Sequence, residues 1–312
     1  MLQFERLRTA WHERAPFLSF TLHRTVRRRS AALGLLGVVG LAAAAASIAV
    51  AAMTLAARSN ALGAANGRMG IGLYVVTTSL LGVAAMLITP LLACEGLSRQ
   101  RDSKTYDLLR GSQMPTWQRV AAAPLAALAY GGLLALALLP FFIVAIGLGG
   151  VGLTVVVLTY WIFVLAALLF TAIATAASAI ASSTLVARLI TLGALTAVII
   201  GAAVAMLIMA TTLVTLARGL PIQPGGAAPD MNAQGAARAG LIFLSASNPI
   251  STLVTLVTAT SAGEPWLTVT FGPGTSSLDR WLAPIFWYSL QYPILTGLAW
   301  LLALRRANRL DP

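Results

Sequence analysis

The sequence has few charged and chemically reactive side chains. Its 312 residues include nine acidic residues, two histidines, one lysine and one cysteine. The single cysteine, Cys94, excludes an intrachain disulfide and a thiolate metal cluster. Both histidines, His12 and His23, lie in the first 30 residues, where we expect surface positions. These counts leave little from which to build a metal site or an acid–base site.

The single lysine also argues against ATP hydrolysis by this chain. A nucleotide-binding P-loop has the pattern G-x-x-x-x-G-K-[ST], in which the lysine reaches the phosphates. Lys104 is followed by Thr105, but Ser103 precedes it and no glycine-rich loop is present. We therefore expect no ATPase activity here, so any energy from ATP must come from a partner.

No acidic residue falls inside a long apolar segment. Carriers coupled to ions or protons normally keep ionisable groups at membrane depth, where these groups bind the coupling ion. A secondary carrier is therefore disfavoured. A lipid-modifying membrane enzyme remains an alternative, although no spacing among the acidic residues selects a catalytic pair.

What the chain does contain is apolar sequence. It is 58% hydrophobic and 10% charged, with a mean hydropathy of +0.85, whereas soluble domains are about one quarter charged. A membrane-spanning helix needs about 20 apolar residues. We predict an all-α polytopic membrane protein in which residues 31–312 form one transmembrane domain. Its six spans are expected at about 31–56, 70–93, 120–147, 151–179, 189–217 and 283–304.

The distribution of basic residues predicts the orientation. With a cytoplasmic N-terminus, six spans place 16 of the 21 basic residues inside and five outside. This is the bias expected of cytoplasmic loops, and it puts both termini in the cytoplasm. The net charge of +12 is thus explained by topology, and no nucleic-acid partner is expected.

The first 30 residues form a polar leader before the first span. Phe4, Leu7 and Trp11 recur at helical spacing, with charged residues on the other faces. This pattern predicts an amphipathic helix in the cytoplasmic interface. A disordered basic leader is the alternative.

A long external segment, residues 218–282, follows the fifth predicted span. It contains a weaker apolar run at 241–262. If this run were a seventh span, the arginines near the C-terminus would face outward, against the charge rule. We therefore predict short re-entrant or surface helices, broken at Asn248 and Pro249.

A few hydroxyl side chains interrupt the apolar spans. Thr77 and Thr78 lie in the second span, while Thr171, Thr175 and Ser178 share one face of the fourth. They are candidates for lining a conduit, and interhelical hydrogen bonding explains them equally well. A lining this weakly polar suits an amphiphilic or hydrophobic cargo better than a free ion.

One connection is unusually charged. Cys94–Arg119 carries eight charged residues, and none occurs in Met69–Cys94 or Val120–Ala187. On a helix over 97–110, an apolar arc of roughly 120° forms opposite most of the charges, with Arg101 as an exception inside it. The arc consists of Leu97, Thr105, Leu108 and Leu109. We predict a short amphipathic helix at the cytoplasmic face.

This connection resembles the one between the second and third spans in permeases of ATP-binding-cassette (ABC) transporters of the type-2 exporter class. The match is Thr105-Tyr106-Asp107-Leu108-Leu109, with Pro90 upstream. The leader APFLSFTLHRTVRRRSAALGLLG is similar to that family's arginine-rich entry to its first span. Asn248-Pro249-Ile250 resembles the family's Asn-Pro after the fifth span.

The resemblance implies a coupling helix that docks in a groove of a separate ATPase subunit. It also implies a second permease copy as partner, with ATP and Mg held by the ATPase and no cofactor on this chain. The expected location is the plasma (inner) membrane of a prokaryote. The docking residues would be Glu95, Leu97, Arg99, Arg101, Asp102, Lys104, Thr105, Tyr106, Asp107, Leu108, Leu109 and Arg110. A membrane protein without transport activity, such as an assembly factor, is the alternative.

Overall fold

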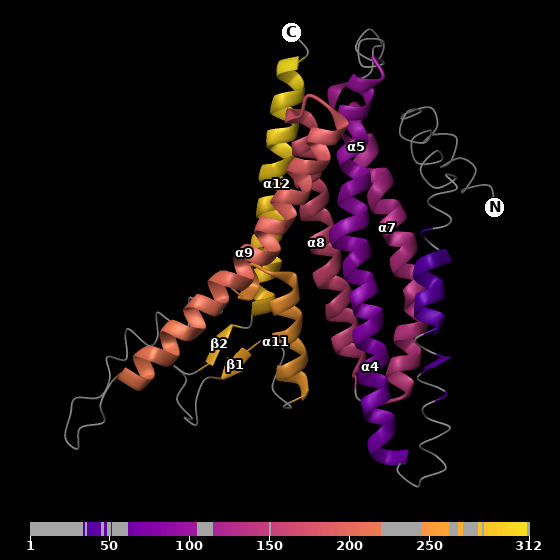
Figure 1. Cartoon of the computed structure of the whole chain (residues 1–312), viewed down its shortest axis with the longest axis vertical. Helices are drawn as coiled ribbons and strands as arrows, with labels where there is room; N and C mark the ends of the chain where they lie inside the picture. Colours follow the sequence, from indigo (N-terminus) through magenta and orange to yellow (C-terminus); the bar gives the residue numbers. More distant parts are fainter. Residues whose placement is uncertain are drawn as a thin grey trace, which may run out of the picture. The chain divides into compact units, whose positions relative to one another are not determined.

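A computed structural model gives the structure of the chain (Figure 1). It describes residues 34, 36–44, 47–48, 51, 62–104, 115–149, 151–219, 245–261, 268–270, 280–282 and 284–310. The predicted leader, residues 1–30, lies outside the described residues. The chain divides into two compact units, residues 1–192 with 295–312 and residues 193–294.

Helices dominate the described residues, as predicted. The long ones are α4 (Leu62–Val83), which continues through η1 (Ala84–Ile88) into α5 (Thr89–Asp102), and then α7 (Thr116–Gly147), α8 (Leu153–Ile180), α9 (Thr184–Gly219) and α12 (Pro284–Leu310). Four helical segments are long and apolar enough to cross a membrane: Gly70–Asp102, Thr116–Gly147, Leu153–Ile180 and Thr184–Gly201. The chain therefore has the character of an integral membrane protein. The number of six spans remains a prediction.

A π-helical turn joins α4 to α5 at Pro90. Proline lacks an N–H, and its ring clashes with the carbonyl four residues earlier in a regular α-helix. The turn before it, η1, is widened, and the Thr89 hydroxyl donates a hydrogen bond of 2.7 Å to the Ala84 carbonyl. The Thr89 N–H bonds the same carbonyl. The wide turn thus accommodates the proline without ending the helix.

In the first unit, α5 packs against both α7 and α8 (Figure 1). Small residues permit the close approach to α7, because a Cβ at Gly96 would lie 2.6 Å from the Ala123 Cβ. Cys94 is fully buried in a cluster of alanines at the same contact. Helices associate in a membrane through such close packing of small side chains.

The second unit contains α11 (Pro249–Ser261) and two short strands. At 13 residues, α11 is about 20 Å long, less than the roughly 30 Å of hydrocarbon in a bilayer. The break at Asn248 and Pro249 is observed, since α11 begins at Pro249. That this segment is re-entrant or lies on the external surface stays a prediction.

The strands β1 (Thr268–Thr270) and β2 (Arg280–Leu282) pair antiparallel, with Thr268 opposite Leu282 and Thr270 opposite Arg280. This short ladder is the exception to the predicted all-α class. Three-residue strands have no helical or alternating period long enough to be recognised in the sequence.

Candidate functional site

The charged connection begins as a continuation of the second predicted span. The helix does not stop near residue 93 but runs to Asp102, and Ser103 and Lys104 form a turn. Lys104 has a φ of 53°, a left-handed conformation that ends a helix. The prediction of one helix over 97–110 is therefore wrong at this turn. Residues 105–114, with Thr105, Tyr106, Asp107, Leu108, Leu109 and Arg110, lie outside the described residues.

Ser103 helps to end α5 at this point. Its hydroxyl donates hydrogen bonds to the carbonyls of Arg99 and Gln100, at 2.9 and 3.3 Å. Its backbone N–H bonds the Arg99 carbonyl, and the Lys104 N–H bonds the Arg101 carbonyl. Serine competes with the helix for its own backbone groups in this way, so the carbonyls of Arg99, Gln100 and Arg101 are satisfied without a further helical turn.

Leu97 faces the interior of the protein. It is 3% exposed and packs in a cluster with Val120, Ala179, Ala303 and Ala307, which joins α5 to α7, α8 and the end of α12. The apolar arc seen in the sequence therefore includes a residue that holds helices together. Leu97 is therefore not available for contact with another protein.

Arg101, which interrupted the predicted arc, points the same way as Leu97 and caps α8. Its guanidinium donates to the carbonyls of Ala181 and Ala179, at 2.8 and 3.0 Å. The last carbonyls of a helix have no partner within the helix, and a cation there also interacts favourably with the helix dipole. Arg101 is thus a C-terminal cap supplied by a neighbouring helix.

Asp102, the next residue, caps the beginning of α9. Its carboxylate accepts a hydrogen bond of 2.9 Å from the Thr184 N–H and a second, short one from the Thr184 hydroxyl. Ser183, just before the helix, also accepts a bond from the Val186 N–H. Carboxylates and serine hydroxyls satisfy the free N–H groups at a helix start, and a negative charge there complements the dipole.

Glu95 adds a third connection, nearly two turns earlier on α5. Its carboxylate forms an ion pair of 2.5 Å with Arg188 of α9 and another of 3.3 Å with Arg99, and both arginine side chains are about half exposed. We call Glu95, Arg101 and Asp102, with their partners on α8 and α9, the helix clamp. All of these residues belong to the first compact unit. The clamp fixes the end of α5 to the end of α8 and to the beginning of α9.

The residues of the helix clamp hold helices together. Its charged groups are paired with each other or with helix ends, and no side chain in it is placed as a nucleophile. Within the described part of the chain, no group of three or more His, Cys, Asp or Glu residues is placed to hold a metal ion. The arrangement can transmit displacement between helices, because the capping bonds of Arg101 and Asp102 keep three helix ends together.

The hydroxyl residues predicted as possible conduit lining are all buried. Thr77 donates to the Leu73 carbonyl, and Thr175 to the Thr171 carbonyl, both at 2.7 Å. Ser178 accepts hydrogen bonds from the backbone N–H groups of Leu97 and Ser98, at 3.1 and 3.0 Å. In the single chain the role that we observe is therefore packing, and a conduit lined by Thr77, Thr78, Thr171, Thr175 and Ser178 stays a prediction.

Asn248 and Pro249 form the beginning of α11. The Asn248 side chain accepts a bond of 2.9 Å from the Ile250 N–H and donates one of 3.0 Å to the Ile199 carbonyl on α9. Asparagine before proline is a favoured helix start, because Pro249 needs no N–H partner there. The motif thus positions α11 against α9 within the second unit.

The partners of the clamp on α8 and α9 were not predicted from the sequence. Arg188 is the only charged residue between Arg119 and Arg218, and that isolation was a signal that it needs a nearby carboxylate. Nothing in the sequence marks Thr184 or the carbonyls of Ala179 and Ala181, because a capped helix end is recognised only once its neighbour is known.

Comparison with known proteins provides no family assignment. No model of a known protein family matches this chain, and no curated protein matches it either. The function must therefore be argued from the helix clamp and from the charged segment that follows it.

Proposed function

We propose that this chain is the membrane-spanning permease subunit of an ABC exporter in a prokaryotic inner membrane. In this proposal it forms the translocation path with a second permease copy and is driven by a separate ATPase subunit that binds ATP and Mg. The segment Thr105–Arg110 is the part that docks on the ATPase. The observation that carries the proposal is the helix clamp, which lies directly before this segment.

The clamp gives the docking segment a mechanical connection to the membrane helices. Only Ser103 and Lys104 separate Asp102 from Thr105. Arg101 holds the end of α8 and Asp102 holds the start of α9, so a displacement of the docking segment moves three helix ends together. Without the clamp, a displacement of the docking segment would bend the chain near Asp102 and would not move the ends of α8 and α9.

The charges within and just before the docking segment support recognition of a protein partner. Lys104, Asp107 and Arg110 alternate in sign, and complementary charges at an interface favour one partner and one orientation. Leu108 and Leu109 between them provide the apolar contact that Leu97, buried inside the chain, does not provide. A coupling role accounts for both features in one short stretch.

Co-purification with a P-loop ATPase encoded beside this chain tests the docking step. We expect a stable complex, and we expect Asp107→Lys combined with Arg110→Glu to weaken it. The control is Arg306→Glu, an exposed position near the end of α12. The proposal fails if no ATPase associates with the purified chain, or if the control weakens the complex as much as the double reversal does.

The ATPase rate of that complex tests transport more directly. We expect the rate to respond to an amphiphile, because the hydroxyl residues of the spans offer only a weakly polar path. Arg101→Met is expected to leave the complex intact and to reduce this response, since the docked segment then no longer moves α8. An unchanged rate across lipids, drugs and peptides would count against export.

A further inference from the structure

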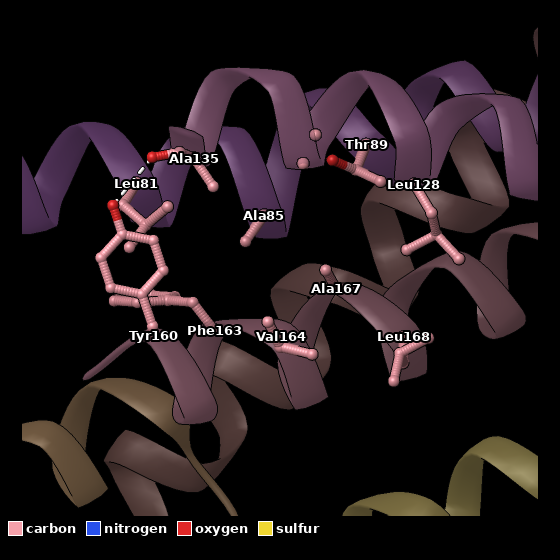
Figure 2. A pocket seen from close by; sticks show the side chains of 12 residues that line it. Leu81, Ala85, Thr89, Leu128, Ala135, Tyr160, Phe163, Val164, Ala167 and Leu168 are labelled. Atoms are coloured by element: carbon pink, nitrogen blue, oxygen red, sulfur yellow. Dashed lines mark hydrogen bonds between the residues drawn. The ribbon is translucent and has the colours of Figure 1, made fainter. Parts of the chain in front are cut away.

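An apolar cavity lies inside the first unit, between the helix that contains η1 and the helices α7 and α8 (Figure 2). Its volume is about 240 Å³. One side is lined from α8 by Tyr160, Phe163, Val164, Ala167 and Leu168, which share one face of that helix at positions i, i+3, i+4, i+7 and i+8. The opposite wall comes from Leu81, Ala85, Thr89, Leu128, Gly131, Gly132 and Ala135.

Two adjacent glycines on α7 have opposite roles in forming the cavity. A Cβ on Gly131 would lie 2.5 Å from the Thr89 Oγ1, so this glycine is needed where α7 meets the widened turn at η1. A Cβ on Gly132 would meet no atom within 4 Å, and Gly132 lines the cavity. The first glycine brings the helices together, and the second leaves the space open.

The polar groups in the lining already have partners. The Tyr160 hydroxyl donates a hydrogen bond of 2.8 Å to the Ala135 carbonyl, drawn as the dashed line in Figure 2. The Thr89 hydroxyl is bonded to the Ala84 carbonyl. Because both hydroxyls donate their hydrogen to a backbone carbonyl of the protein, neither donates a hydrogen bond to a ligand in the cavity. An apolar cavity of this kind stays free of water and accepts apolar molecules.

The cavity opens sideways rather than toward an end of the helices. Its floor is buried, with Leu81 and Phe163 at 3% and 4% exposed, while Val164 at its edge is 48% exposed and Gly132 is exposed as well. Gly132 stands at the centre of the candidate span Thr116–Gly147. In a bilayer this depth is hydrocarbon, so lipid tails reach the opening and head groups do not.

We infer that this cavity binds the end of an acyl chain of a membrane phospholipid. Lipid tails are as apolar as the lining, so hydrophobicity alone does not drive binding. An unfilled void loses dispersion contacts on all its walls, and a flexible chain end restores them without requiring a hydrogen bond. The inference needs the helices to lie in a bilayer, and it is independent of the proposed ATPase partner.

Photolabelling in liposomes tests this inference. The full chain is reconstituted in phosphatidylethanolamine and phosphatidylglycerol with a phosphatidylcholine that carries a diazirine at the end of one acyl chain. Adducts are located by mass spectrometry of peptides. We expect enrichment at Val164, Ala167 and Leu168 over the exposed α9 residues Leu189 and Leu192, and no enrichment with a probe in the head group.

Filling the cavity provides the matched comparison. Gly132→Leu should abolish the enrichment, and Gly193→Leu, at another exposed glycine with no atom within 4 Å of its Cβ, should preserve it. Ala167→Phe fills the cavity from α8 and replaces Gly132→Leu if that variant does not fold. Equal labelling of cavity and α9 residues, or enrichment that survives filling, overturns the inference. Neither result depends on ATPase binding, so each proposal can fail alone.

Discussion

Replacing Arg101 tests the helix clamp most sharply. Arg101→Met keeps most of the side-chain volume but removes both hydrogen bonds to the carbonyls of Ala179 and Ala181. A hydrogen bond from a charged donor contributes about 1.5–3 kcal/mol. Because the two bonds share one side chain and are not additive, we expect a loss of about 2–4 kcal/mol in the free energy of unfolding.

Unfolding of the purified protein by dodecyl sulfate, followed by tryptophan fluorescence, measures this loss. Arg99→Met is the matched control, because Arg99 lies on the same helix and its ion pair with Glu95 is exposed. Exposed pairs of this kind contribute about 0.5 kcal/mol or less. Arg101→Lys keeps the charge but not the planar fork that reaches two carbonyls, so its loss should be intermediate.

The test compares the loss of unfolding free energy in Arg101→Met with the loss in Arg99→Met. If Arg101→Met destabilises the protein no more than Arg99→Met does, the capping bonds do not hold the end of α8. The clamp would then be a surface feature, and its role in transmitting movement would have no energetic basis.

Three further predictions concern other contacts. Asp102→Ala should accelerate hydrogen exchange at the Thr184 amide, which loses its acceptor, while Asp102→Asn should change it less; an unchanged amide after removal of the carboxylate would contradict the cap. Gly131→Ala should cost about 1–3 kcal/mol of unfolding free energy by overpacking, and combining it with Thr89→Ala should recover part of the loss; independent effects in denaturant titrations would disprove the clash. Asn248→Ala should cost about 1–2 kcal/mol and open the first turn of α11 to hydrogen exchange, with Asn248→Asp as the milder control.

Much of the helical architecture follows from the sequence alone. Long apolar segments with few charges must form helices in a membrane, because each backbone group needs an internal hydrogen bond there. The break at Asn248 and Pro249 was predictable for a local reason, since proline restricts the residue before it. These features depend on residues that are neighbours in the chain, so composition and spacing are enough to find them.

The end of the second span was not predictable in this way. Loss of apolar residues near position 93 suggested a boundary, yet α5 continues to Asp102. Its charged turns are stabilised by groups about 80 to 90 residues later in the sequence, including Thr184 and Arg188. A pattern-based prediction counts a charge as a reason to end a span, but charges with partners on other helices allow the helix to continue.

Sequence by itself therefore determined that this is a helical membrane protein and which segment is unusually charged. Tertiary structure decided what the charges near that segment do. In the sequence, Arg101 interrupts an amphipathic stripe, whereas in the structure it caps the end of α8. Leu97 was predicted to dock on a partner, but neighbours on α7 and α8 bury it. The physical reason is that capping and burial are properties of a residue's spatial neighbours, which the order of residues along one helix does not contain.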